Sequence, residues 1–249
     1  MKRRKLKGFP GMLLLMLIFV FAEGCTTDAS KHTPEEWLSL SYSGLEAMDQ
    51  YAFTGSTSMG LEGGVMFQPQ TFEGRISNHE QLTIQSRQQG EHDWNPIEVL
   101  KTLNQSNQSV VISGEGADEA SSTPILTLRV EEAPDVTKER WSARLKEELE
   151  QVAGSGREAA DEGARSNRDE VLDASRQELQ AMLETLVCSS VYDITIDRRR
   201  LIPLKMEEKT SFQYIRAGHA MKESRHTTVR LQDFDGSAAA EPTTGGITK

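Results

Sequence analysis

The stretch from Val191 to Phe234 reads VYDITIDRRRLIPLKMEEKTSFQYIRAGHAMKESRHTTVRLQDF, and the rest of the chain is interpreted around it. Its apolar residues recur on even numbers: Tyr192, Ile194, Ile196, Ile202, Leu204, Met206, Phe212 and Tyr214. A period of two over three short runs, interrupted at Arg198–Arg200 and at Lys209, is typical of an antiparallel meander with one buried face. The odd positions are expected to face water: Asp193, Asp197, Lys205 and Glu207.

Earlier segments with the same alternation predict further strands of an antiparallel sheet with one wet and one covered face. These segments are residues 52–60, 71–76, 80–87, 108–116 and 123–131. Residues 34–234 are expected to form one domain, because a chain of this length suits a single core. Residues 235–249 have the composition of a disordered tail.

Two helices are predicted by their start signals. Thr33-Pro34-Glu35-Glu36 is a capping box, in which Thr is the N-cap, Pro opens the helix and Glu occupies the third position. Apolar residues at helical spacing come next, so this helix is expected to run to about Gln50. Asn95-Pro96 starts a second, shorter helix by the same logic.

Two longer helices are predicted between the strand regions. The third helix is expected to be capped by Asp135 or Thr137, and the fourth by Ser166 or Asp169. Arg157–Arg168 has no apolar face and is expected to be a solvated connection or a frayed helix. The apolar stripes are Trp141, Leu145, Leu149 and Val152 in the third helix and Leu172, Leu179, Met182, Leu183 and Leu186 in the fourth. The fourth stripe is expected to point at the sheet, which gives an α+β fold with three or four helices.

The first 24 residues predict export. A basic start precedes the apolar run Met12–Phe21, which is too short to span a bilayer and has the length of a secretory signal. The segment resembles a bacterial lipoprotein signal, in which a small residue precedes the cysteine that receives the lipid. Gly24 and Cys25 match this motif, whereas Glu23 departs from it. An ordinary cleaved signal peptide and an uncleaved short anchor are the alternatives.

Lipidation of Cys25 is expected to make residues 25–33 a short tether to the outer face of the cytoplasmic membrane. Without residues 1–24 the chain keeps 23 Lys and Arg against 37 Asp and Glu, a formal charge of −14. So acidic a domain is not expected to bind nucleic acid, and anionic lipid headgroups would repel it without a covalent anchor. The second cysteine, Cys188, ends an apolar stripe and is expected to be a buried thiol.

We find no catalytic signature in the sequence. The five histidines lack metal-ligand spacing, and the glycine pairs at Gly114-Glu115-Gly116 and Gly154-Ser155-Gly156 match turns better than phosphate-binding loops. Asp193 and Asp197 lie on the predicted wet face, where a carboxylate has no reason to acquire the raised pKa of a general acid. A metal site, a cofactor and an enzymatic activity are therefore not expected.

Three short segments resemble the bacterial lipoprotein families with a LolA-like or LppX-like fold: Tyr51–Gly55, Tyr192–Asp197 and Leu201–Met206. This resemblance implies a strongly curved antiparallel sheet, a half-barrel, that wraps around helices laid in its concave face. Members with known roles carry lipids or lipidated proteins between sheet and helices. A fold does not transmit that role by itself.

Two hypotheses arise for the function. In the first, the protein binds a lipid or another hydrophobic ligand, and flexible methionines with aromatic residues line the cavity. The lining residues would be Phe53, Met59, Met182, Ile194, Met206, Phe212 and Tyr214. In the second, the same residues form a solid core, and the protein is a tethered structural or interaction module of the cell envelope or spore.

Overall fold

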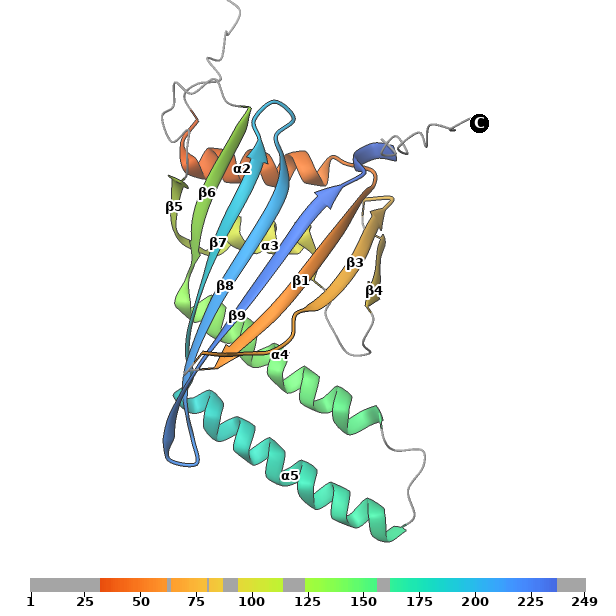
Figure 1. Cartoon of the computed structure of the whole chain (residues 1–249), viewed down its shortest axis with the longest axis vertical. Coiled ribbons are helices and arrows are strands. Elements are labelled where there is room, and N and C mark those ends of the chain that lie inside the picture. Colours follow the sequence, from red (N-terminus) through yellow and green to blue (C-terminus); the bar gives the residue numbers. More distant parts are fainter. Residues whose placement is uncertain are drawn as a thin grey trace, which may run out of the picture. The chain divides into compact units, whose positions relative to one another are not determined.

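An antiparallel sheet of nine strands forms the body of the protein, in the order β4-β3-β1-β9-β8-β7-β6-β5, with β2 paired to β1 (Figure 1). The computed structural model describes residues 32–61, 64–79, 81–86, 94–113, 124–155 and 162–236, which belong to one compact unit. The sheet is curved (Figure 1). It is also unclosed, because within these residues β4 and β5 pair with one neighbour each. Together with the helices this makes the α+β half-barrel that was expected.

The elements succeed one another along the chain in a simple order. The strands are β1 (Tyr51–Leu61), β2 (Val65–Met66), β3 (Gln70–Ser77), β4 (Gln81–Ser86), β5 (Asn107–Ser113), β6 (Ile125–Glu132), β7 (Val187–Asp197), β8 (Ile202–Arg216) and β9 (His219–Gln232). The helices are α2 (Pro34–Glu46), α3 (Pro96–Ser106), α4 (Pro134–Ser155) and α5 (Glu162–Thr185), and η2 (Phe234–Gly236) is a 3-10 turn. The expected signal, Cys25 and most of the tether and tail lie outside the described residues.

The meander β7-β8-β9 has the predicted alternation, with one correction. Seven of the eight even-numbered apolar residues are buried, and Leu204 is half-buried beside Pro203, where a register shift between Thr195 and Ile196 disturbs the alternation. The expected interruption at Lys209 is wrong. Lys209 lies inside a continuous β8, and its ammonium group pairs with Asp193 at 3.3 Å on the outer face. A charged residue therefore marks a solvent-facing position here and not a strand end.

Helices α2 and α3 begin as predicted. They pack on one face of the sheet, which we call the inner face. The Thr33 hydroxyl accepts from the Glu36 amide at 3.2 Å, and Asn95 caps α3. Helix α2 ends at Glu46, not near Gln50, because the chain must turn there to enter β1. Gly44 allows α2 to lie close to the backbone at Leu201, since a Cβ at residue 44 would overlap the Leu201 carbonyl oxygen.

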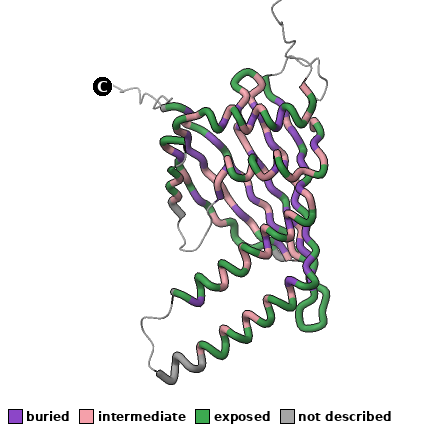
Figure 2. The backbone as a smooth tube through the Cα atoms, turned by 180° about the vertical axis from the view of Figure 1, so that it is seen from behind, coloured by how far each residue is buried: buried purple, intermediate pink, exposed green. Residues whose placement is uncertain are grey.

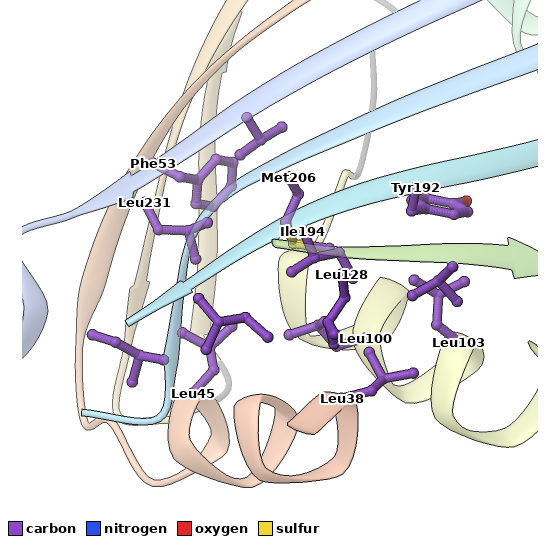
Figure 3. Close-up of a cluster of buried hydrophobic side chains, with 14 of the residues drawn as sticks. Leu38, Leu45, Phe53, Leu100, Leu103, Leu128, Tyr192, Ile194, Met206 and Leu231 are labelled. Atoms are coloured by element: carbon purple, nitrogen blue, oxygen red, sulfur yellow. The ribbon is translucent and has the colours of Figure 1, made fainter. Parts of the chain in front are cut away.

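The main hydrophobic core lies between these two helices and the sheet (Figure 3). Leu38 and Leu45 of α2 and Leu100 of α3 face strand residues such as Ile194 and Met206, and each of the five has an exposed fraction of 1% or less. A second, smaller cluster joins α4 and α5 to the far ends of β7 and β8: Trp141, Leu183, Leu186, Cys188, Phe212 and Tyr214. Cys188 is buried as expected.

Helix α5 differs from its prediction. It begins at Glu162, ahead of the expected caps Ser166 and Asp169, so the second part of Arg157–Arg168 is helical, which is one of the two alternatives expected for that stretch. The stripe points at the sheet near the base as predicted, with Leu183 and Leu186 buried and Leu179 and Met182 half-buried in the second cluster. Toward its start, α5 extends away from the sheet (Figure 2).

Two helical glycines test the packing of α2. We expect Gly44→Ala to destabilise the protein by about 1–3 kcal/mol, because backbone atoms of Leu201 occupy the space of the new methyl group. Gly154→Ala in α4 is the matched control, since a Cβ there meets open space and Ala favours a helix by about 0.5–1 kcal/mol. Urea unfolding measures both, and equal effects of the two substitutions would contradict the packing.

Candidate functional site

A buried polar network separates the two hydrophobic clusters on the inner face of the sheet. Its centre is Arg140 in the second turn of α4, and its other members come from β6, β7, β8 and α4 itself. We call it the Arg140 network: Glu132, Thr137, Arg140, Ser190, Tyr192, Glu208 and Thr210. Apart from Arg140, each of these residues has an exposed fraction of 5% or less.

Arg140 binds two carboxylates at once. Its Nε and Nη2 donate to the two carboxylate oxygens of Glu132 at 3.2 and 2.7 Å, a bidentate pair. The same Nη2 lies 3.0 Å from Glu208 Oε1 and 2.8 Å from the hydroxyl of Tyr192. Since Glu132 ends β6 and Glu208 lies in β8, one guanidinium group connects α4 to two strands that are not neighbours.

Hydroxyl groups complete the network. Tyr192 donates to Glu208 Oε1 at 2.8 Å, and Thr137 donates to Glu132 Oε2 at 2.9 Å. Ser190 and Thr210 share a hydrogen bond of 2.7 Å, and Thr210 also reaches Glu208 at 3.3 Å. These short contacts supply the partners that buried carboxylates require.

The surroundings of Glu208 and Arg140 favour the charged form of both side chains. Burial opposes the ionisation of Glu208, but the guanidinium of Arg140 and the hydrogen bond from Tyr192 outweigh it, so the pKa of Glu208 is lowered. Burial also opposes the charge of Arg140, yet Tyr192, Glu208 and Glu132 together raise its pKa. Burial, with Glu208 beside it, raises the pKa of Tyr192 far above its ordinary value. Glu208 is therefore ionised at neutral pH, opposite to what a general acid needs.

Trp141 comes directly after Arg140 in α4 and packs in the second hydrophobic cluster. Its ring meets Phe212 of β8 edge to face at 4.9 Å between centroids. The guanidinium groups of Arg140, Arg144 and Arg225 lie 5.4, 5.1 and 5.0 Å from the centre of the ring. Cation–π contacts of this kind stabilise by about 0.5–2 kcal/mol each. The base of α4 is thus fixed by ion pairs on one side and by Trp141 on the other.

Beyond this base, α4 and α5 form a hairpin that projects from the sheet, and we call it the helical arm (Figures 1 and 2). The helices have 22 and 24 residues. Arg176 of α5 pairs with Glu150 of α4 at 2.8 and 2.9 Å, and Arg168 donates to the carbonyl of Ala153 at 2.6 Å. The two helices are therefore tied to each other along the arm as well as at its base.

The arm leaves apolar side chains in water. Val152 of α4 is 67% exposed and Val171 of α5 is 58% exposed, whereas Leu183 at the base is 7% exposed. A pocket of about 170 Å³ lies between the helices and is lined by Lys146, Leu149, Glu150, Arg176, Leu179 and Gln180. The outer part of the arm thus presents an apolar and charged surface that the core of the protein does not use.

The structure places the seven expected cavity residues in three different environments. Phe53, Ile194 and Met206 are buried in the main core, the cluster to which α2 and α3 side chains also belong (Figure 3). Phe212 and Tyr214 are buried in the second cluster, where Met182 is half-buried. Met59 is 41% exposed. The Arg140 network lies between the two clusters, so these residues do not line one common space.

A larger pocket lies on the outer face of the sheet. It has a volume of about 410 Å³ and is lined by Ala52, Phe53, Thr54, Glu73, Gly74, Arg75, Thr83, Gln232 and Asp233. Within the described residues, no group of three or more His, Cys, Asp or Glu side chains has the arrangement of a metal site. The expected lipidation site, Cys25, is outside the described residues.

Comparison of the chain with models of known protein families and with curated protein sequences finds no match. None of the described helices is both long and apolar enough to cross a membrane.

The Arg140 network gives a first test. We expect Arg140→Met to destabilise the protein by about 3–5 kcal/mol, because it leaves Glu132 and Glu208 buried without their cation. Arg129→Met is the matched control, since Arg129 pairs with Asp193 on the exposed outer face and its loss should cost about 1 kcal/mol or less. Urea unfolding of both variants measures the difference. Similar small losses would show that the network does not hold the base of α4.

The lowered pKa of Glu208 predicts how stability depends on pH. Its stabilising effect is complete above the ordinary value of 4.5 and is lost as the pH falls through the lower pKa of the folded state. The parent protein should therefore exceed Glu208→Gln in stability most clearly near neutral pH, and the two should converge in acid. Thermal unfolding over a pH series measures this. A difference that stays constant into acid would refute the assignment.

Proposed function

We propose that the protein is an exported, non-enzymatic interaction module, anchored through a lipid on Cys25 at the outer face of the cytoplasmic membrane, that binds a protein partner with its helical arm. The observation that carries the proposal is the arm itself, two long helices that pack against the sheet at their base and are largely exposed beyond it.

The tether fits a module that works close to a membrane. Seven residues separate Cys25 from Thr33, the N-cap of α2, so the chain reaches at most about 30 Å from the anchor to the domain. The start of α2 is itself held, because the capping box closes at Thr33 and the His32 ring meets Trp37 at 5.0 Å. An anchor on Cys25 would thus keep the domain near the lipid surface.

The arm is more than the fold requires. Helices α2 and α3 already cover the main core, and the second cluster needs only the basal turns of α4 and α5. In the outer turns Ala153 is buried but Val152 and Val171 are mostly exposed, and the ion pair between Arg176 and Glu150 holds the two helices together. A helix pair held in one conformation before binding loses less conformational entropy when a partner docks. Val171 on the exposed part of α5 is an apolar contact for such a partner.

Binding of a hydrophobic ligand, the alternative function, has less support. Five of the seven residues expected to line the cavity have an exposed fraction of 8% or less: Phe53, Ile194, Met206, Phe212 and Tyr214. Neighbouring side chains of the core already cover them, and the ion pairs of Arg140 lie between the two groups. An acyl chain would need to displace one of these clusters.

Photocrosslinking in the native membrane tests the proposal. A photoreactive amino acid at Val171 should give a discrete crosslinked product, whereas the same group at Arg230, exposed on the outer face of the sheet, should give none. The parent chain should also incorporate radiolabelled palmitate, and Cys25→Ser should not.

Equal labelling at Val171 and Arg230, or none at Val171, would refute a partner site on the arm. Palmitate retained by Cys25→Ser would refute the anchor. Lipid recovered by organic extraction from the folded domain of Cys25→Ser would instead favour the ligand-binding function.

A further inference from the structure

Strand β5 ends the sheet with an edge that is suited to meet a copy of itself. Within the described residues β5 pairs only with β6, so alternate N–H and C=O groups of β5 point away from the sheet. Edge strands usually carry charges or proline, which prevent pairing with another chain. The sequence from Asn104 to Gly114 contains neither, although 27% of the chain is charged.

The sequence of this edge is symmetric. Ser109-Val110-Val111-Ile112-Ser113 reads with the same residue classes in both directions around Val111. In an antiparallel pair of two such strands centred on Val111, valine meets valine at the axis. Val110 then meets Ile112 of the other copy, and Ser109 meets Ser113. Each pair combines like with like, as cross-strand pairing favours.

The alternation of the strand and the residue pairs that result together favour one register of this edge. Paired residues must lie on the same face of a sheet, so only shifts that keep odd opposite odd and even opposite even are allowed. Centring the pair on Val110 would place Val111 opposite Ser109, and centring it on Ile112 would place Val111 opposite Ser113. Both alternatives put an apolar side chain against a hydroxyl. The register centred on Val111 is thus distinguished by the sequence.

Exposure points to the same residue. Val111 lies on the outer face with 48% of its surface exposed, while Val110 and Ile112 face the core. The other edge strand, β4, has the polar residue Thr83 at the corresponding central position. Pairing across β5 would cover an apolar side chain, and no charge of β5 would oppose it.

We infer that two copies of this chain associate through β5 about a twofold axis at Val111, which joins their sheets into one continuous antiparallel sheet. Such an interface is isologous, because the same strand is used by both copies. The axis is normal to the sheet, so α2 of both copies lies on the same side. The first described residues of both copies, which precede α2, then lie on one side of the joined sheet, as anchoring in one membrane would require. The association itself does not depend on the anchor.

Cysteine crosslinking tests the register. Val111→Cys should form a disulfide-linked dimer on mild oxidation, because residue 111 faces itself across the axis. Ser109→Cys alone should not, since two copies of residue 109 would lie about 14 Å apart. A mixture of Ser109→Cys and Ser113→Cys chains should give the mixed dimer. The parent chain controls for Cys25 and Cys188, and Thr83→Cys controls for the other edge.

Sedimentation equilibrium of the full chain in mild detergent tests the association without a crosslink. Val111→Lys should weaken the dimer by about tenfold or more, because it places two like charges opposite each other at the axis. Val187→Lys, at a residue 66% exposed on β7, should leave it unchanged. A monomeric parent chain, crosslinking at Thr83→Cys without Val111→Cys, or equal effects of the two lysines would overturn the inference.

Discussion

The guanidinium group of Arg140, bound to the carboxylates of Glu132 and Glu208, fixes the start of α4 on the inner face of the sheet. It joins the start of α4 to strands on either side of β7, in the middle of the inner face. A buried ion pair of this kind adds little net stability compared with a well-packed apolar core, but losing one partner is costly. Its effect is to allow one orientation of α4 and to disfavour others.

The division of the core results from this contact. The main core between sheet, α2 and α3 excludes water around Ile194 and Met206, and it contains the residues with the lowest exposure. The smaller cluster around Trp141 is formed on the far side of the network. The sheet therefore has two roles. It forms the main core together with α2 and α3, and the far ends of β7 and β8 support the base of the arm. This arrangement suits a module that presents a helical surface at a fixed place.

The sequence predicted the parts of this structure that depend on local chemistry. The capping box at Thr33 and the alternation of β7 are local patterns, and both are confirmed. The Arg140 network was missed, although a signal was present: Glu208 and Thr210 share the even phase of the buried residues of β8. Alternation shows that such a side chain points inward, but its partner is 68 residues away in sequence, which local patterns do not reveal. The stripe of α5 was found, and its partner was predicted correctly near the base, since Leu179, Met182, Leu183 and Leu186 pack in the cluster that contains Phe212 and Tyr214 of β8.

The orientation of the arm is the property that the Arg140 network should control most directly. Spin labels on cysteines introduced at Val171 on the arm and Arg230 on the outer face of the sheet measure this by double electron–electron resonance in a chain that carries Cys25→Ser, since Cys188 is buried. We expect one narrow distance distribution for the otherwise unaltered chain and a broad one when Arg140→Met is added. A broad distribution without that substitution, or a narrow one that the substitution leaves unchanged, would contradict a network that holds the arm in one orientation.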